Sequence, residues 1–377
     1  MAGIYIHIPF CKQRCRYCSF FSSTRNGEKE RYVDAVCQEI EMRSDYLDNS
    51  TIETIYFGGG TPSTLSEKDF GKIFATIESR YKICKDAEIT MEGNPDDLSE
   101  EYLAMLRNQP FNRISMGVQS FDDTILKTLG RRHDAARAIE AFESARKAGF
   151  DNISIDLMFA LPGSNAQSWE KDLATATSLH PEHISAYNLT YEEGTPLYSA
   201  MQQGTIVPLD EDGNIEQFTM LIDRLTAAGY RHYEISNFAL PGRESRHNSS
   251  YWHNIPYLGC GAAAHSYNGT SRRWNIADIP LYIKGIASGN GDYEEEILSE
   301  SERYNDALLT RLRTSDGLPL KWMEENFSAK LNRYMLKNAQ RHLDAGTLTT
   351  TDDGSIRLTK KGIFISDAII RDLIYID

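Results

Sequence analysis

Three cysteines, Cys11, Cys15 and Cys18, lie close together and directly follow the apolar run 4–10. Their spacings of four and three residues let three thiolates gather on one face of a tight loop. An iron–sulfur cluster needs this arrangement, because each cysteine ligates a different iron. In a [4Fe–4S] cube, three protein thiolates leave one iron open. The pattern therefore predicts a [4Fe–4S] cluster held by these three cysteines.

Zinc is the competing interpretation, because cysteine thiolates also ligate zinc. A structural zinc site closes with four ligands, and the remaining cysteines, Cys37, Cys84 and Cys260, each stand alone in the sequence. His7 or His253 would then have to supply the fourth ligand. The residue pattern favours the cluster over zinc.

The stretch from Cys11 to Cys18 resembles the signature of radical S-adenosylmethionine (SAM) enzymes. The resemblance implies that the amino and carboxylate groups of SAM bind the open iron. It also implies that the reduced cluster breaks a C–S bond of SAM and yields a 5′-deoxyadenosyl radical. Tyr17, just before the third cysteine, would pack near the SAM adenine.

The elements that must position this loop alternate between strand-like and helix-like runs. Strands are predicted at 4–8, 54–57, 88–92, 113–118, 152–158, 183–189 and 232–235. Amphipathic helices are predicted around 33–40, 70–77 and 218–225, where apolar residues recur at helical spacing. The run 66–69 has the form of a helix-capping box, and Gly149 and Gly229 stand where helices should end. Repeated strand–helix units predict a parallel sheet, open or closed into a barrel.

Chemistry on such a sheet collects at the carboxyl ends of the strands. The cysteine loop follows the first strand, a run of glycines at 58–60 follows the second, and polar residues end the third, fourth and fifth. Each polar residue could also be an ordinary ion pair or strand end. The resemblance implies SAM contacts from Tyr5, Tyr17, Gly59, Gly60, Thr61, Glu92, Gln119, Arg131 and Asp156.

These patterns predict an α/β fold: a partial (β/α) barrel of the radical SAM type over residues 1–237. Residues 238–299 show little periodicity and are predicted to be an irregular connecting region. Residues 300–377 are predicted to form helices followed by a hairpin at 347–350 and 355–358. They predict a C-terminal, mostly helical, winged-helix-like domain.

The second unusual stretch is 246–253, which combines imidazole, phenol and indole side chains. It could ligate or stack on a flat macrocycle. A loop that packs under the barrel would explain the same residues, and the residues by themselves favour this second interpretation. Further motifs at 8–11, 58–63, 115–121, 156–163 and 257–259 make the chain similar to the coproporphyrinogen dehydrogenase branch of the radical SAM enzymes. That branch contains an oxygen-independent haem-biosynthesis enzyme and its haem-chaperone relatives.

Two departures separate the chain from the enzyme of that branch. Phe20 stands where the enzyme carries a further cysteine, and the enzyme has a substantial segment ahead of its cluster, whereas Cys11 lies near the start of this sequence. The run 247–252 instead matches the His-Asn-x-x-Tyr-Trp motif associated with haem binding in the HemW-type chaperones. The resemblance implies haem contacts from His247, Tyr251 and Trp252, with His247 as the first candidate for an axial ligand.

The implied function is a haem chaperone that binds haem, SAM and a [4Fe–4S] cluster and delivers haem to acceptor haemoproteins, among them respiratory membrane enzymes. An electron donor is a further expected partner. The alternative is oxygen-independent coproporphyrinogen III oxidase, which decarboxylates two propionates of its substrate. A radical SAM enzyme with an unrelated substrate is a third possibility, because one fold supports many functions.

Composition limits the other partners. A formal net charge of −14 argues against nucleic acid, whose phosphates need clustered Lys and Arg. No apolar stretch reaches the length of a membrane span, and no secretory signal precedes the first strand. Six cysteines with three crowded together do not form a disulfide framework. The sequence therefore predicts a cytoplasmic protein, with peripheral association to a membrane left open.

Overall fold

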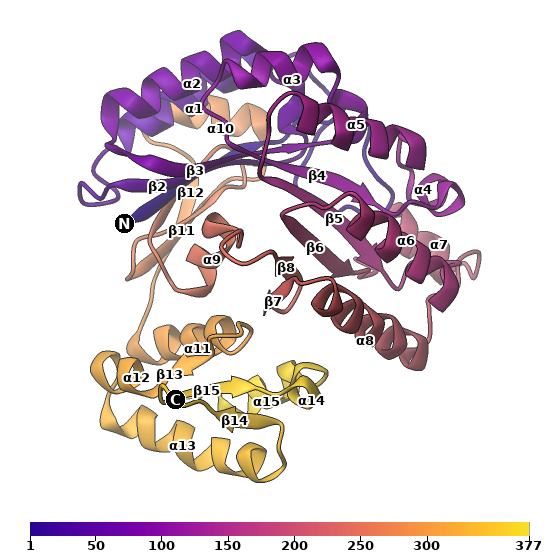
Figure 1. The fold of residues 1–377 in the computed structure, drawn as a ribbon. Helices are drawn as coiled ribbons and strands as arrows, with labels where there is room; N and C mark the ends of the chain where they lie inside the picture. Colours follow the sequence, from indigo (N-terminus) through magenta and orange to yellow (C-terminus); the bar gives the residue numbers. More distant parts are fainter. Residues whose placement is uncertain (377) are drawn as a thin grey trace.

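A computed structural model describes residues 1–376 and shows, over that part of the chain, a 12-stranded sheet and a smaller three-stranded sheet (Figure 1). Six parallel strands form the centre of the large sheet in the order of the sequence. They are β1 (Ala2–Ile8), β2 (Ile52–Gly59), β3 (Ile83–Gly93), β4 (Arg113–Gln119), β5 (Ile153–Phe159) and β6 (His183–Asn188). Figure 1 shows the sheet curving without closing. The partial barrel predicted from the sequence is therefore confirmed.

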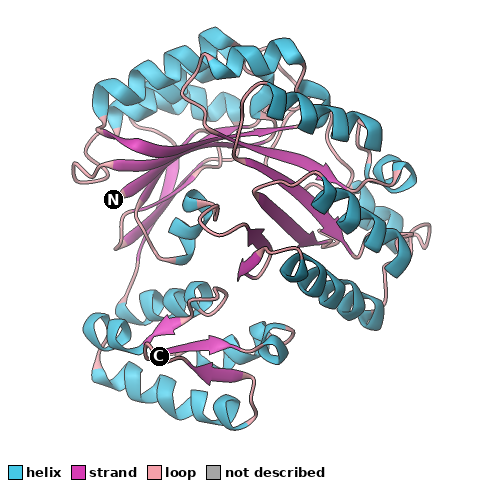
Figure 2. Ribbon diagram, in the orientation of Figure 1, coloured by secondary structure: helices cyan, strands magenta, loops and turns pink. Residues whose placement is uncertain are grey.

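Helices that lie between these strands or follow β6 cover the outer face of the sheet (Figures 1 and 2). They are α1 (Lys29–Met42), α2 (Glu67–Arg80), α3 (Glu100–Arg107), α4 (Asp123–Leu129), α5 (Ala135–Lys147), α6 (Ala166–Ser178), α7 (Pro196–Gln202) and α8 (Glu211–Ala227), with short 3₁₀ turns η1 (Pro62–Thr64) and η2 (Pro95–Asp97). The predicted capping box is present at Ser66 and Asp69. Gly149 and Gly229 follow α5 and α8 with φ of 94° and 91°, which glycine adopts without strain.

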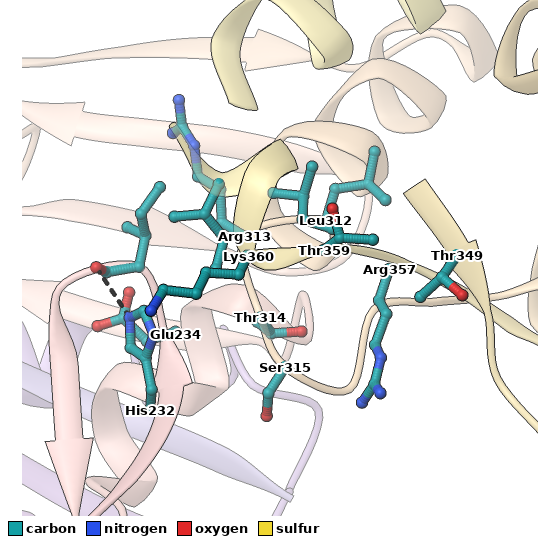
Figure 3. Close-up of a pocket in the computed structure, with 13 residues that line it drawn as sticks. His232, Glu234, Leu312, Arg313, Thr314, Ser315, Thr349, Arg357, Thr359 and Lys360 are labelled. Atoms are coloured by element: carbon teal, nitrogen blue, oxygen red, sulfur yellow. Dashed lines mark hydrogen bonds between the residues drawn. The ribbon is translucent and has the colours of Figure 1, made fainter. Parts of the chain in front are cut away.

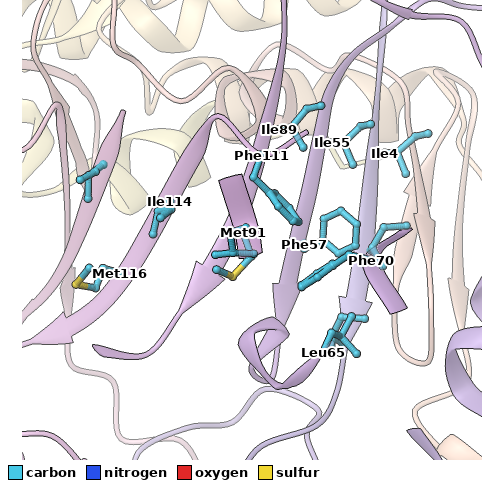
Figure 4. Close-up of a cluster of buried hydrophobic side chains, with 14 of the residues drawn as sticks. Ile4, Ile55, Phe57, Leu65, Phe70, Ile89, Met91, Phe111, Ile114 and Met116 are labelled. Carbon is cyan, nitrogen blue, oxygen red and sulfur yellow. The ribbon is translucent and has the colours of Figure 1, made fainter. Parts of the chain in front are cut away.

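Alternate residues of each parallel strand face opposite sides of the sheet. Figure 4 shows part of the outward set: Phe57 packs against Phe70 and Phe111, and the same apolar core includes Ile4 and Met116. The inward set includes polar residues such as Glu92, Ser115 and Asp156. Its side chains line the barrel interior, where the cysteine loop and the strand ends meet.

Residues 238–299 are more regular than the sequence predicts. They contain most of β8 (Asn237–Ala239), and β9 (Tyr257–Cys260), β10 (His265–Tyr267), β11 (Ser271–Asn275), β12 (Tyr293–Ile297), α9 (Arg246–Trp252) and α10 (Ile279–Ala287). β9 pairs in parallel with β1 and extends the sheet through β12. At the other edge, β7 (Arg231–Glu234) and β8 run antiparallel to their neighbours. Strands this short carry too few residues to show a periodicity, and long-range pairing determines them.

The C-terminal unit has its own apolar core. It contains α11 (Glu300–Arg311), β13 (Leu318–Pro319), α12 (Leu320–Asn326), α13 (Ala329–Asp344), β14 (Leu348–Thr350), β15 (Ser355–Leu358), α14 (Lys360–Ile363) and α15 (Ser366–Leu373). The β14–β15 hairpin confirms the predicted wing. No helix within residues 1–376 is both long and apolar enough to cross a membrane.

The two units meet at the end of β7. Ser315 N donates to Tyr233 O at 2.9 Å, and a cavity of about 310 Å³ lies beside this contact. Figure 3 shows that Arg313 and Arg357, which line the cavity, point away from one another. Lys360 is already paired with Asp223 of α8. The positively charged side chains that line the cavity therefore do not converge on one point.

Candidate cofactor site

The cysteine loop closes over the carboxyl end of β1. Cys11 N donates to Ser23 O at 2.9 Å, and Ser23 N donates back to Pro9 O at 2.7 Å. Cys11, Cys15 and Cys18 all line one cavity of about 460 Å³. Burial raises the pKa of the Cys11 and Cys18 thiols above their usual value, so loading a metal there must release protons.

The donor set fits an iron–sulfur cube. Within residues 1–376, no three His, Cys, Asp or Glu side chains are gathered closely enough to hold a single metal ion. The three thiols instead lie around a shared cavity, as ligands of separate irons would. His7, a candidate for a fourth zinc ligand, is buried and hydrogen-bonded to Phe21 O at 3.1 Å.

The glycine run after β2 packs directly against the cysteine loop. Gly59 has φ of 106°, and a Cβ there would lie 2.5 Å from the His7 ring. A Cβ on Gly60 would lie 2.8 Å from the Pro9 backbone carbon. Only glycine fits at these two positions, and their backbone is left open to the cavity they line.

Two carboxylates, one on β3 and one on β5, line the same cavity. Glu92 accepts hydrogen bonds from Tyr56 Oη at 2.7 Å and from Gly59 N at 3.2 Å. Asp156 accepts one from Ser115 Oγ at 3.2 Å. Burial raises the pKa of both carboxyls, that of Glu92 to about 7. The cavity lined by the thiols thus also offers acceptor groups for hydroxyls or an amine.

The raised pKa of Glu92 predicts a pH-dependent stability. Its ordinary pKa is 4.5, so between about pH 4.5 and 7 the unfolded chain loses a proton that the folded protein keeps. The free energy of unfolding should therefore fall as pH rises through this window, by up to about 3 kcal/mol from this group. Glu92→Gln removes the titration. In urea unfolding at pH 5 and pH 8, the variant should gain stability relative to wild type at the higher pH.

Asp156, whose charge helps to raise the pKa of Glu92, titrates together with it. Comparing the two proteins removes the contribution of buried carboxyls that do not interact with Glu92. Glu234, whose pKa burial also raises to about 7, is one of them. A difference in unfolding free energy that stays constant between pH 5 and pH 8 would contradict the prediction.

Arg131 and Gln119 complete the wall of the cavity. Arg131 Nη1 donates to Cys15 Sγ at 3.2 Å, and its Nη2 donates to Asn94 Oδ1 at 2.6 Å. Its Nε is buried without a partner among the described residues. A buried donor left unsatisfied is costly, and a ligand carboxylate such as that of SAM would satisfy it. Gln119 ends β4 in the left-handed region, with φ of 70°.

Nine residues were predicted to contact SAM, and the structure brings eight of them to the cavity; these are Tyr17, Gly59, Gly60, Thr61, Glu92, Gln119, Arg131 and Asp156. Tyr5 is outside the lining residues. Its hydroxyl hydrogen-bonds His7 Nδ1 at 3.1 Å, deeper in the barrel. Contact of each residue with SAM stays a prediction.

The residues predicted to contact haem lie on α9, inside the curved sheet (Figure 1). His247 is buried, with Nδ1 hydrogen-bonded to Thr54 Oγ1 and Nε2 to Tyr251 Oη, both at 2.8 Å. Its ring stacks on Tyr56 at 4.9 Å. Both ring nitrogens are therefore engaged in this conformation. Tyr251 and Trp252 are partly exposed but do not line the cavity.

α9 nevertheless contributes to the cavity. Glu88 of β3 accepts hydrogen bonds from Arg246 N at 3.0 Å and His247 N at 2.9 Å, which anchors the start of the helix to the barrel interior. Asn248, the second residue of the His-Asn-x-x-Tyr-Trp motif, lines the cavity as a result. One wall of the candidate cofactor site thus comes from the motif helix.

Sequence reasoning missed Asn94, Asp97 and Asp172. Asp97 accepts hydrogen bonds from Lys12 Nζ at 2.6 Å and Ser63 Oγ at 3.1 Å, and so fixes the cysteine loop against the glycine run. The Asn-Pro-Asp-Asp turn after the third strand is a signal that could have revealed the first two. Asp172 accepts from Phe121 N at 2.8 Å and holds the turn after Gln119, but it lies mid-helix, where no local pattern distinguishes it.

Comparison with known proteins agrees with this geometry. Residues 5–176 match the radical SAM superfamily, and residues 298–365 match the HemN C-terminal domain. The chain is 35% identical to heme chaperone HemW of Bacillus subtilis over 98% of each chain. It is 32% identical to heme chaperone HemW of Lactococcus lactis, over 99% of this chain and 97% of the relative. Among solved structures, coproporphyrinogen III oxidase (HemN) from Escherichia coli shares the fold with a TM-score of 0.85 and 23% identity, over 99% and 90% of the two chains.

Proposed function

The chain belongs to the HemW family of the radical SAM superfamily, and on this premise we propose that it binds haem, SAM and a [4Fe–4S] cluster and delivers haem to acceptor haemoproteins. The observation that carries the proposal is the full-length similarity to heme chaperones HemW. The cavity supports it, because three thiols, the glycine run and the orphaned Arg131 donor surround one space. When bound, the cluster and SAM would supply one-electron chemistry at this place.

The residues of the chain have separate tasks in this proposal. Cys11, Cys15 and Cys18 ligate the cluster, and Arg131 holds the carboxylate of SAM. Glu92 and Asp156 accept hydrogen bonds from its amine or hydroxyl groups. This function requires two kinds of partner. They are the haem acceptors, which in the simplest case are respiratory haem enzymes, and a low-potential electron donor.

The second candidate is oxygen-independent coproporphyrinogen III oxidase, because HemN shares the fold over nearly the whole chain. Fold alone cannot separate the two functions. Phe20 argues for the chaperone. It lies at the cavity, 68% exposed, where the enzyme carries a further cysteine.

One experiment separates the two functions. Reconstituted protein is titrated anaerobically with haem, and the same sample is then assayed with SAM and reductant for conversion of coproporphyrinogen III to protoporphyrinogen IX. Haem retained on gel filtration without decarboxylation supports the chaperone. Turnover to protoporphyrinogen would establish the enzyme despite Phe20.

Haem contact at α9 predicts that His247→Ala weakens haem retention without removing the cluster. For His247 to ligate iron, its ring must give up a hydrogen bond to Thr54 or Tyr251, so haem binding and the packed conformation of the ring compete. Gel filtration of the haem-loaded variant measures the retention, and iron–sulfur absorbance measures the cluster.

Two control variants distinguish ligation from packing. His253→Ala removes a more exposed imidazole at the end of the same helix and should leave retention unchanged. Thr54→Val removes the hydrogen bond to His247 Nδ1 but keeps the ring. If His247 ligates haem, Thr54→Val retains haem, whereas a purely structural ring predicts loss in both variants. Unchanged retention in His247→Ala would exclude the ligand assignment.

A further inference from the structure

Side chains from two different loops donate hydrogen bonds to two of the cysteine sulfurs, those of Cys11 and Cys15. Thr61 Oγ1, after the glycine run, donates to Cys11 Sγ at 3.4 Å. Arg131 Nη1, after α4, donates to Cys15 Sγ at 3.2 Å. Asn94, the first residue after β3, connects the donors: its Nδ2 donates to Thr61 Oγ1 at 3.3 Å and its Oδ1 accepts from Arg131 Nη2 at 2.6 Å. A continuous path thus joins the two sulfurs.

The chemistry of these groups fixes the direction of every proton along the path. A guanidinium only donates, so the carbonyl oxygen of the Asn94 amide must face Arg131. The amide nitrogen then faces Thr61, whose oxygen accepts from it. A hydroxyl has a single proton to donate. Because the Thr61 oxygen accepts the hydrogen bond from the Asn94 amide, the Thr61 proton is directed to the Cys11 sulfur. Asn94 therefore determines where the Thr61 proton points.

Burial makes this orientation persistent. Thr61 is 4% exposed, and Asn94 and Arg131 are partly buried where they line the cavity. Hydrogen bonds in such surroundings are stronger than in water. Water competes poorly for these donors, so they remain directed at the sulfurs.

Hydrogen bonds to the sulfurs are one of the factors that set the reduction potential of an iron–sulfur cluster. Reduction adds one electron, and a donor aimed at a ligand sulfur stabilises the added negative charge. We propose that Asn94 and Thr61 are positioning residues that raise the reduction potential of the cluster ligated by Cys11 and Cys15. The step concerned is the addition of one electron from a low-potential chemical reductant, with no bond formed or broken and no proton transferred. The proposal rests on the proposed function only in requiring the cluster.

The test is an anaerobic redox titration of the reconstituted full chain, with dithionite as reductant and the reduced cluster followed by electron paramagnetic resonance. Thr61→Val keeps the volume of the side chain and removes the donor, whereas Thr61→Ser restores a hydroxyl. We expect a shift of the midpoint potential to more negative values in Thr61→Val and in Asn94→Ala, and a potential close to wild type in Thr61→Ser. Thr64→Val is the matched control, because the Thr64 hydroxyl donates to Thr61 O and not to a sulfur.

Each outcome decides the proposal. An unchanged potential in Thr61→Val with a full cluster overturns it. Failure of Thr61→Val to hold the cluster also overturns it, in favour of a role in retention. An equal shift in Thr61→Ser or Thr64→Val would show that the loop, and not the hydroxyl proton, sets the potential. Wild-type protein that takes up no cluster would instead refute the proposed function, which keeps the two failures apart.

Discussion

Replacement of Cys15 by alanine is expected to abolish the iron–sulfur absorbance of the reconstituted protein. Cys15 is the middle one of the three proposed cluster ligands, and Arg131 donates a hydrogen bond to its sulfur. A cube with one open iron needs three thiolates. With only Cys11 and Cys18 left, a second iron would lose its protein ligand. Iron and sulfide analysis after anaerobic reconstitution measures the loss.

The matched control is Cys84→Ala. Cys84 is also partly exposed, but it lies on β3 and its thiol donates to Asp86 Oδ1 at 2.9 Å. This variant should keep the full content of iron and sulfide. Full iron–sulfur absorbance in Cys15→Ala, or its loss in Cys84→Ala, would show that the cluster is not held by the cysteine loop. It would also remove the basis for placing SAM in the cavity.

The parallel centre of the fold could be predicted because strand-like runs alternate with helix-like runs, and apolar residues recur at helical spacing around 33–40 and 70–77. The six strands of this centre, β1 to β6, lie where the sequence places them. At the edges of the sheet, β7 lies where the sequence predicts a strand, at 232–235, but β8 to β12 could not be predicted in the same way. β9 consists of Tyr257–Cys260 and becomes a strand by pairing with β1, more than 250 residues away in sequence. Nothing within four residues specifies such a distant partner.

The residues of the candidate site likewise differ in whether the sequence could place them. Residues at or just after the end of a strand, such as Glu92 and Thr61, could be placed because carboxyl ends of parallel strands share one edge of the sheet. His247 could not, because the sequence does not show that Thr54 and Tyr251 occupy its two ring nitrogens. Asn94 was missed because its role lies in contacts with two other loops.

The second prediction with a large expected effect concerns the buried ion pair of Glu39 and Arg43. This pair connects the barrel to the segment that adds strands β9 to β12 to the sheet. Glu39 of α1 is fully buried and receives four hydrogen bonds, from Arg43 Nη1 at 3.1 Å, Asn275 Nδ2 at 2.8 Å, Gly261 N at 2.9 Å and Tyr282 Oη at 2.7 Å. Three of these donors belong to residues 261–282. This carboxylate therefore joins α1 to the segment that the sequence left irregular.

Glu39→Ala should lower the free energy of unfolding by roughly 3–5 kcal/mol, because it leaves the buried Arg43 without its counter-charge. Urea unfolding measures the change. Glu41→Ala on the same helix is the control. Its surface pair with Arg80, at 3.5 Å and about half exposed on both sides, should contribute less than about 1 kcal/mol.

The double variant Glu39→Met/Arg43→Met separates the lost charge from the lost packing. If the cost of Glu39→Ala comes from an uncompensated guanidinium, removing both charges should restore much of the stability, since apolar groups can replace a buried pair. If the double variant is less stable than Glu39→Ala, the loss instead lies in the hydrogen bonds to Gly261, Asn275 and Tyr282. The carboxylate would then act as the specific link between α1 and the added strands, and no apolar residue could take its place.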